Sequence, residues 1–421
     1  MKSWRLWALV AVVALTASAS AFASSAQDVT ITWWHNANTD PGRGFWQQVA
    51  DEYEKAHPGV TIDVVPYQNE QFLTKIPVAL QSDDPPDLFQ QWGGGQMAEQ
   101  VKAGKVMDLT AAVKPWIKSI GGSAAGWQYN GKQYGIPYTL GIVGFWYNKA
   151  LFRQAGISTP PKTWGQFLAA VRKLKSAGIT PIAIGAKDRW PSAFWWDYLA
   201  VRYCSQRTMQ QAQVSFKFND PCWVKAGVAT AQIRDAEPFQ KGFLATPAQQ
   251  GAASSAGLIG NGKAAMELMG HWNPSVMNGL TPNRKGLGKN LGWFAFPSVP
   301  GGKGASRAAL GGGDGFSCSW KAPPQCVDFL KYLLSPGVQK RWGKLGIGLP
   351  VTKGSESSVT DPNLKGLLQF RSASPFVQTY LDIAYGNQVG QAVNDAVSSL
   401  LAGKMTPVQV VKSIQDAAKR T

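Results

Sequence analysis

The chain has 421 residues, 44% of them hydrophobic, with 45 glycines, 18 tryptophans and a formal net charge of +17. This length exceeds what one hydrophobic core usually supports, so it predicts two domains. The 42 Lys and Arg residues are dispersed, and the longest basic run near the C-terminus is Lys419-Arg420. This dispersal argues against a nucleic-acid-binding protein despite the positive charge.

Residues 1–23 are typical of a cleavable signal peptide. Lys2 and Arg5 provide the positive charge, an apolar stretch covers 6–15, and Ala-Phe-Ala at 21–23 fits a cleavage site. The apolar stretch is shorter than the roughly 20 residues that span a bilayer. No cysteine lies near the predicted cleavage site. We therefore expect an exported protein without a lipid anchor.

The next segment predicts a parallel sheet built from βαβ units. Strands at 29–33, 60–65 and 87–90 alternate with helices at 45–56 and 69–80. Ligands of open α/β sheets bind outside the carboxyl ends of the strands. At or near these ends the chain places a first group of candidate ligand-binding residues: Trp34, His35, Asn36, Asp40, Glu70, Trp92 and Gly93.

Residues 134–152 predict a crossing between two lobes. Glycines and a proline are followed by an apolar run at 142–147 that predicts a buried strand, so Tyr138 should face a cleft at the crossing. Residues 291–297 and 346–350 predict the second and third crossings. The expected boundaries are an N-terminal lobe of 24–138 and 298–345 and a C-terminal lobe of 139–297 and 346–421.

In the second half, a helix is expected at 163–177, because Thr163 and Gln166 form a capping pair and Gly178 follows. Further helices are expected at 325–334, 388–403 and 406–419. Strands are expected at 181–185 and 263–269, and their exits carry aromatic and polar residues. The candidates from this half are Asp188, Trp190, Trp195, His271, Trp272 and, in a glycine-rich segment, Asp314.

The four cysteines predict disulfides, since their number is even and the chain carries an export signal. Three connectivities are open. Pairing Cys204 with Cys222 and Cys318 with Cys326 is favoured, because each bond would close a loop inside one lobe. The chain has three histidines and no zinc-like Cys-x-x-Cys spacing, so we expect no metal and no cofactor.

Non-covalent sugar binding fits the candidate residues better than catalysis does. Nucleophile-elbow, His-Glu-x-x-His and phosphate-loop motifs do not occur in the sequence. A sugar ring offers apolar faces to aromatic side chains and hydroxyl edges to polar ones. A secreted glycoside hydrolase is the alternative, with a carboxylate pair drawn from Asp40, Glu70, Asp188, Glu267 and Asp314. A receptor for polyamines or peptides would require carboxylates clustered in the cleft.

Six short motifs lie at 134–138, 146–152, 160–164, 262–266, 270–272 and 403–407. They resemble motifs of the extracellular solute-binding proteins (family 1) of carbohydrate ABC importers. The resemblance implies an α/β periplasmic-binding-protein fold with two lobes, each a mainly parallel sheet flanked by helices, joined by three crossovers. It also implies hinge closure on a sugar, docking on membrane permease subunits and no enzymatic activity. We expect a periplasmic monomer.

Carried over by position, the resemblance implies that Trp92 and Trp272 stack on sugar rings and that Asp314 binds hydroxyls. Trp195 and Tyr385 match regions that often contribute rings, whereas His271 stands where the family usually has proline. A finer resemblance, to receptors for xylobiose and longer xylo-oligosaccharides, lies in residues 32–35, 38–41, 69–72, 84–87 and 91–95. Cello- and malto-oligosaccharides stay open as alternative ligands.

Overall fold

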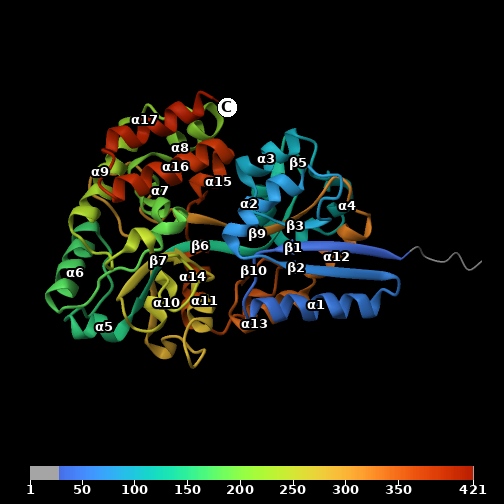
Figure 1. The fold of residues 1–421 in the computed structure, drawn as a ribbon, viewed down its shortest axis with the longest axis horizontal. Coiled ribbons are helices and arrows are strands. Elements are labelled where there is room, and N and C mark those ends of the chain that lie inside the picture. Colours follow the sequence, from blue (N-terminus) through green and yellow to red (C-terminus); the bar gives the residue numbers. More distant parts are fainter. Residues whose placement is uncertain (1–27, 421) are drawn as a thin grey trace, which may run out of the picture.

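The computed structural model describes residues 28–420, so the predicted signal peptide lies outside the described residues. The chain forms two α/β lobes side by side, joined by strands that run through both (Figure 1). Each lobe has its own hydrophobic core. The N-terminal lobe draws its core from residues 31–138 and 316–351, and the C-terminal lobe draws most of its core from 142–310 and 359–418.

The N-terminal lobe begins with the predicted βαβ order. Strand β1 (Val29–His35) pairs in parallel with both β2 (Val60–Pro66) and β3 (Leu88–Gln91), so the parallel sheet is confirmed here. Side chains alternate along β1, and Ile31 and Trp33 are fully buried. The helices and smaller elements of this lobe are α1 (Gly42–Ala56), α2 (Asn69–Ala79), α3 (Gly94–Lys102), α4 (Thr110–Val113), η1 (Ile117–Trp127), β4 (Gln128–Tyr129), β5 (Lys132–Gln133), α12 (Gln325–Leu333) and α13 (Pro336–Leu345).

Two long antiparallel strands, β6 (Ile136–Asn148) and β9 (Ala309–Cys318), join the lobes. In β6, Tyr138 belongs to the N-terminal core and Phe145 to the C-terminal core. The predicted crossing at 134–152 is therefore β6. The short strand β10 (Leu349–Pro350), at the expected third crossing, pairs with β6.

The second crossing lies later in the chain than expected. Strand β8 (Leu291–Phe294) pairs with the far end of β6 and stays in the C-terminal lobe. The buried guanidinium of Arg202 holds the following segment in that lobe, donating hydrogen bonds to the carbonyls of Phe296, Pro297 and Ala308. The chain crosses back in β9, whose Phe316 belongs to the N-terminal core.

The named strands of the C-terminal lobe pair with β6 in antiparallel fashion, unlike the mainly parallel sheet expected there. These are β7 (Met266–Gly270) and β8, whereas β11 (Val377–Thr379) pairs in parallel with β9. Residues 181–185 form no strand, because only Ile182 makes isolated parallel bridges. The other elements are α5 (Lys149–Gln154), α6 (Trp164–Ser176), η2 (Ala186–Asp188), α7 (Trp190–Tyr203), α8 (Gln206–Ser215), α9 (Pro221–Asp235), η3 (Phe243–Ala245), α10 (Ser255–Gly260), α11 (Asn273–Gly279), η4 (Gly288–Asn290), η5 (Glu356–Ser358), α14 (Pro362–Ser372), α15 (Leu381–Ala384), α16 (Gly386–Leu401) and α17 (Pro407–Ala418).

Local signals in the sequence hold in the structure. The Thr163 hydroxyl accepts a hydrogen bond from the Gln166 backbone N–H, and the Gln166 side chain accepts one from the Thr163 backbone N–H. These two bonds confirm the predicted start of α6. The favoured disulfides are also confirmed, Cys204 with Cys222 and Cys318 with Cys326.

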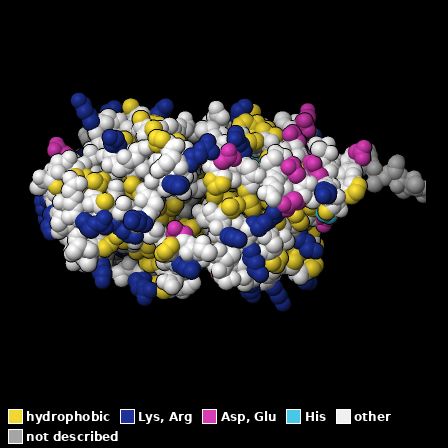
Figure 2. Space-filling model, turned by 90° about the horizontal axis from the view of Figure 1, so that it is seen from below, with side chains coloured by type: hydrophobic (Ala, Val, Ile, Leu, Met, Phe, Trp, Pro, Cys, Tyr) yellow, Lys and Arg dark blue, Asp and Glu magenta, His cyan; other side chains and the backbone are white. Residues whose placement is uncertain are grey.

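Basic side chains are scattered over both lobes on the face that Figure 2 shows, without merging into one patch. None of the helices at 28–420 is long and apolar enough to cross a membrane.

Candidate functional site

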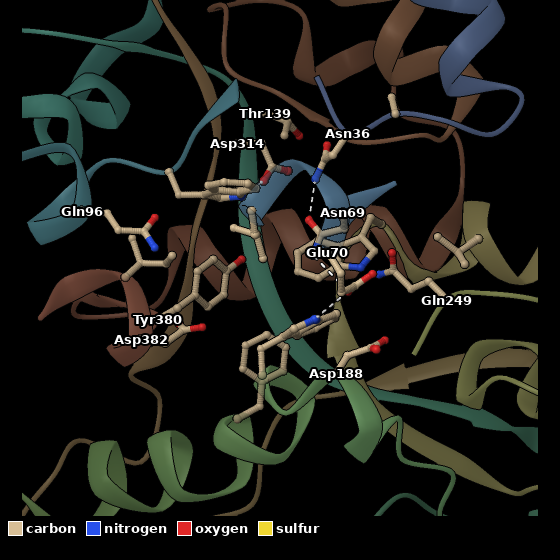
Figure 3. A pocket seen from close by; sticks show the side chains of 18 of the residues that line it. Asn36, Asn69, Glu70, Gln96, Thr139, Asp188, Gln249, Asp314, Tyr380 and Asp382 are labelled. Atoms are coloured by element: carbon tan, nitrogen blue, oxygen red, sulfur yellow. Dashed lines mark hydrogen bonds between the residues drawn. The ribbon is translucent and has the colours of Figure 1, made fainter. Parts of the chain in front are cut away.

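A cavity of about 730 Å³ lies where the two lobes meet, within the size range of small-molecule sites. The N-terminal lobe contributes the loop after β1, the start of α2, Trp92 and Asp314. The C-terminal lobe contributes η2, the start of α7, the turn after β7, and the segment from Tyr380 into α16. Figure 3 shows polar side chains from both sides directed toward the same space.

Glu70, in the first turn of α2, links the two lobes. Its carboxylate accepts from the Trp190 indole N–H at 3.2 Å and from the Gln250 amide at 3.3 Å, both from the opposite lobe. Asn69 also donates to Glu70 and accepts from Asn36 at 3.0 Å (Figure 3). Three polar residues are thereby held in fixed positions along one wall.

Asp314 lies in β9 and accepts from the Trp92 indole N–H at 2.7 Å. Burial raises the pKa of Asp314 to about 6, and the Trp92 hydrogen bond opposes part of that rise. The bond fixes the plane of the Trp92 ring at the cavity wall, and Phe72 packs against that ring with centroids 5.8 Å apart.

The turn after β7 presents His271 and Trp272. His271 is 2% exposed, and burial lowers its pKa to about 3, so the ring is neutral near pH 7. Its Nε2 lies 3.3 Å from the Thr139 hydroxyl. The Trp272 ring lies against the backbone of Gly270, where a Cβ would overlap it. A glycine is thus required two residues before this tryptophan.

Aromatic rings from both lobes line the cavity. In the C-terminal lobe, Trp190 and Trp272 have ring centroids 6.3 Å apart, and Phe194 lies 5.5 Å from Tyr380. Trp92 adds a ring from the N-terminal lobe. The Tyr380 hydroxyl is buried and has no partner within 28–420, which leaves it available to a ligand.

Four carboxylates line the cavity: Glu70, Asp188, Asp314 and Asp382. No salt bridge within 28–420 involves any of them. Burial raises the pKa values of Asp188 and Asp382 to about 6, as it does for Asp314. The one cationic side chain in the lining, Arg189, pairs with Asp395. The cavity therefore has an acidic character in a basic protein.

The structure brings nine of the predicted site residues to the cavity. They are Asn36, Glu70, Trp92, Tyr138, Asp188, Trp190, His271, Trp272 and Asp314. The remaining six lie outside its lining: Trp34, His35, Asp40, Gly93, Trp195 and Tyr385.

Three of these six are buried aromatic side chains. Trp195 is 1% exposed and packs against Phe145 in the C-terminal core. Tyr385 is also 1% exposed and packs edge-on against Phe218 at 5.0 Å. His35 is fully buried beside Trp33, and burial lowers its pKa to about 3. These positions correct the expectation of ligand contact, because the rings are covered by protein.

The other three serve local structure. Trp34 packs against Tyr67, with ring centroids 4.8 Å apart. Asp40 accepts from the Gly44 amide and pairs with Arg43 in the first turn of α1. Gly93 is buried and has a φ of +73°, and a Cβ there would meet the Gly126 carbonyl. Each of these three residues therefore stabilises the local structure of the chain.

Several glycines near Trp92 and Asp314 lie against other parts of the backbone. A Cβ on Gly311 or Gly313 would strike β6 at Gly141 or Thr139, and one on Gly95 would strike Ala384 and Gly386. Close packing of strands and lobes explains these glycines.

The sequence interpretation missed the segment that follows β11. Tyr380, Asp382, Asn387, Gln391 and Asn394 all line the cavity, whereas Tyr385 is the one candidate that the sequence offers in this segment. Tyr380 and Asp382 follow a three-residue strand, so the rule of strand exits applied to Val377–Thr379 would have found them. Gln96 and Gln249 were also missed, and no local signal marks either one.

Comparison with solved structures finds the same fold in other proteins. One structure, from work on xylan utilisation by the thermophilic bacterium Caldanaerobius polysaccharolyticus, is 26% identical with a TM-score of 0.85, covering 92% of this chain and 99% of that one. A chitin oligosaccharide binding protein has the same fold, with a TM-score of 0.83 at 23% identity, covering 93% and 98%.

Sequence comparison gives a consistent result. An uncharacterised ABC transporter extracellular-binding protein of Pyrococcus horikoshii, PH1039, is 28% identical over 60% of this chain, and the alignment spans 58% of the relative's length. The multiple sugar-binding protein of Streptococcus mutans is 23% identical, over 70% of this chain and 69% of its own. Because the family model for bacterial extracellular solute-binding proteins matches residues 36–340, this chain belongs to that family.

Proposed function

We propose that this protein is the substrate-binding component of an ABC importer and that it holds an oligosaccharide in the cavity between its lobes. The observation that carries the proposal is the lining, in which aromatic rings from both lobes alternate with amide and carboxyl side chains. The family consists of binding proteins rather than enzymes. The proposal includes a periplasmic monomer that closes by a hinge motion and then docks on permease subunits.

In the proposed complex, the faces of Trp92, Trp190 and Trp272 stack on the apolar faces of sugar rings. Asn36, Glu70 and Asp314 bind hydroxyl groups, which can donate to a carboxylate and accept from an amide. Tyr380 adds a hydroxyl that has no partner within 28–420. Such a site binds through many hydrogen bonds to groups already held in place, so little side-chain ordering is required.

Xylobiose and longer xylo-oligosaccharides are the proposed ligands. The 26% identical structure from work on xylan utilisation supports this choice, together with the motifs at 32–41 and 84–95. Cello- and malto-oligosaccharides are alternatives, because the same side-chain types bind their hydroxyls.

Tryptophan fluorescence with a panel of di- and trisaccharides tests the proposal. A bound sugar should change the emission and, at about 100 times its dissociation constant, raise the free energy of unfolding by about 2.7 kcal/mol. If no sugar in the panel changes either signal, the carbohydrate assignment is wrong. Release of shorter sugars on prolonged incubation would contradict a receptor and support a hydrolase.

The four cavity carboxylates favour a second candidate, a receptor for a polyamine. Polyamines carry several ammonium groups, and unpaired carboxylates in a partly buried cavity attract them. Adding spermidine and putrescine to the panel separates the two candidates. A polyamine signal that weakens with added salt, together with no sugar signal, would favour this candidate.

A further inference from the structure

Helix α3 of the N-terminal lobe contacts the C-terminal lobe beside the cavity, which its residue Gln96 lines. A Cβ on Gly95 would lie 2.5 Å from the Gly386 nitrogen and 2.7 Å from the Ala384 carbonyl oxygen. A Cβ on Gly94 would lie 3.2 Å from the Ile383 carbonyl oxygen. The backbones of the two lobes therefore touch directly at these glycines, an approach that side chains would prevent.

One turn further along α3, Glu99 completes this contact. Its carboxylate accepts from the Asn387 backbone N–H at 3.1 Å and from the Asn387 side-chain amide at 2.7 Å. Asn387 is in the first turn of α16, where backbone N–H groups have no partner within the helix. A carboxylate at a helix N-terminus is also favoured by the helix dipole. An acid of one lobe thus caps a helix of the other.

We propose that Gly95, Glu99 and Asn387 form an interlobe clamp that sets the population of the closed form. Gly95 and Glu99 are absent from the cavity lining, whereas Asn387 belongs to it, as do Glu70 and its partner Trp190. The clamp is made only when the lobes meet, and the two residues that α3 contributes to it, Gly95 and Glu99, do not line the cavity. It therefore determines how tightly every ligand binds without determining which ligand binds.

The expected signature follows from the population of the binding-competent form. The apparent dissociation constant equals the intrinsic constant divided by the competent fraction, so loss of the clamp weakens all ligands by one factor. Gly95→Ala should weaken binding about tenfold or more, because the atoms it meets are backbone and cannot move aside. Glu99→Gln should weaken it about three- to tenfold, because the cap loses its charge.

The Gly95→Ala variant distinguishes an effect on lobe closure from an effect on folding. Alanine favours helix over glycine, so the variant should melt at the same temperature as the native chain or higher when no ligand is present. Gly337→Ala is the matched control, since Gly337 is also the second residue of a helix in the N-terminal lobe and no atom lies within 4 Å of its added Cβ. Glu237→Gln, on an 84% exposed glutamate, is the control for loss of charge.

The experiment measures affinities for xylotriose and cellotriose by calorimetry and, without ligand, the radius of gyration by X-ray scattering. Equal fold-losses for both sugars and a larger radius for Gly95→Ala support the clamp. Unchanged affinity, or a loss confined to one sugar, would overturn it. The ligand readout rests on the proposed function, but the scattering readout does not. If neither sugar binds the native chain, equal radii overturn the clamp and a larger radius supports it.

Discussion

The Trp92–Asp314 pair shows how one hydrogen bond can orient two ligand-binding groups. The indole N–H donates to the carboxylate at 2.7 Å, so the ring presents its face and Asp314 keeps lone pairs for a ligand. We expect Trp92→Ala to weaken sugar binding about tenfold, or about 1.4 kcal/mol, and Trp92→Phe to weaken it less. Calorimetric titration checks this. Trp320→Ala, at a surface tryptophan 42% exposed, should leave the affinity unchanged.

Asp314 should also make stability depend on pH. Its pKa, about 6 in the folded chain, exceeds the roughly 4 of an unfolded one, so the folded state holds the proton more tightly. The stabilisation from this group is complete below about pH 4 and is lost as the pH rises through 6. Asp314→Asn should therefore stabilise the protein by about 1–3 kcal/mol at pH 7.5 and hardly at pH 4.

Urea unfolding of both proteins at the two pH values measures that difference. An equal gain at pH 4 and pH 7.5 would show that ionisation of Asp314 is not its cause.

At the residue scale, sequence reasoning found side chains that follow strands but could not separate cavity from core. Trp190 and Trp195 lie five residues apart in one helix, and only Trp190 lines the cavity, because Trp195 turns toward Phe145. The prediction that Trp34 lies in the cavity fails for a related reason, because the neighbours of β1 in the sheet decide which residues each face of β1 contacts. These contacts are tertiary, so no local sequence pattern predicts them.

At the element scale, the disulfide Cys204–Cys222 closes a loop that contains α8. We expect the double substitution Cys204→Ala, Cys222→Ala to lower the free energy of unfolding by about 3 kcal/mol, since the bond spans 18 residues. Cys318–Cys326 spans only 8 residues, so removing it should cost roughly 0.7 kcal/mol less in the same urea experiment. The reverse order of the two losses would contradict a loop-entropy origin.

Elements that are marked by local sequence signals could be predicted, whereas strands that depend on their neighbours in the sheet could not. The capping pair of Thr163 and Gln166 sets the start of α6 whatever surrounds it. Residues 181–185 look like a strand, but only Ile182 bridges to neighbours. Similarly, β9 crosses between lobes as a glycine-rich strand whose register with β6 is a tertiary property.

At the scale of the whole molecule, the crossing strands tie the two cores together. Tyr138 and Phe145 of β6, like Phe316 and Leu310 of β9, belong to different cores. Unfolding one lobe would pull these strands out of the other. We therefore expect one calorimetric transition, which a bound sugar shifts as a unit to higher temperature. Two separate transitions in the scan would contradict this coupling.

The discontinuous N-terminal lobe also fixes an order of assembly during synthesis. Its core needs Phe316, Leu330 and Trp342, which are made about 180 residues or more after Tyr138. Until they emerge, the first βαβ units lack the apolar side chains that complete their core, and pairing β3 with β9 must close a very long loop. The first lobe to be translated is thus unable to finish folding before most of the second has been made.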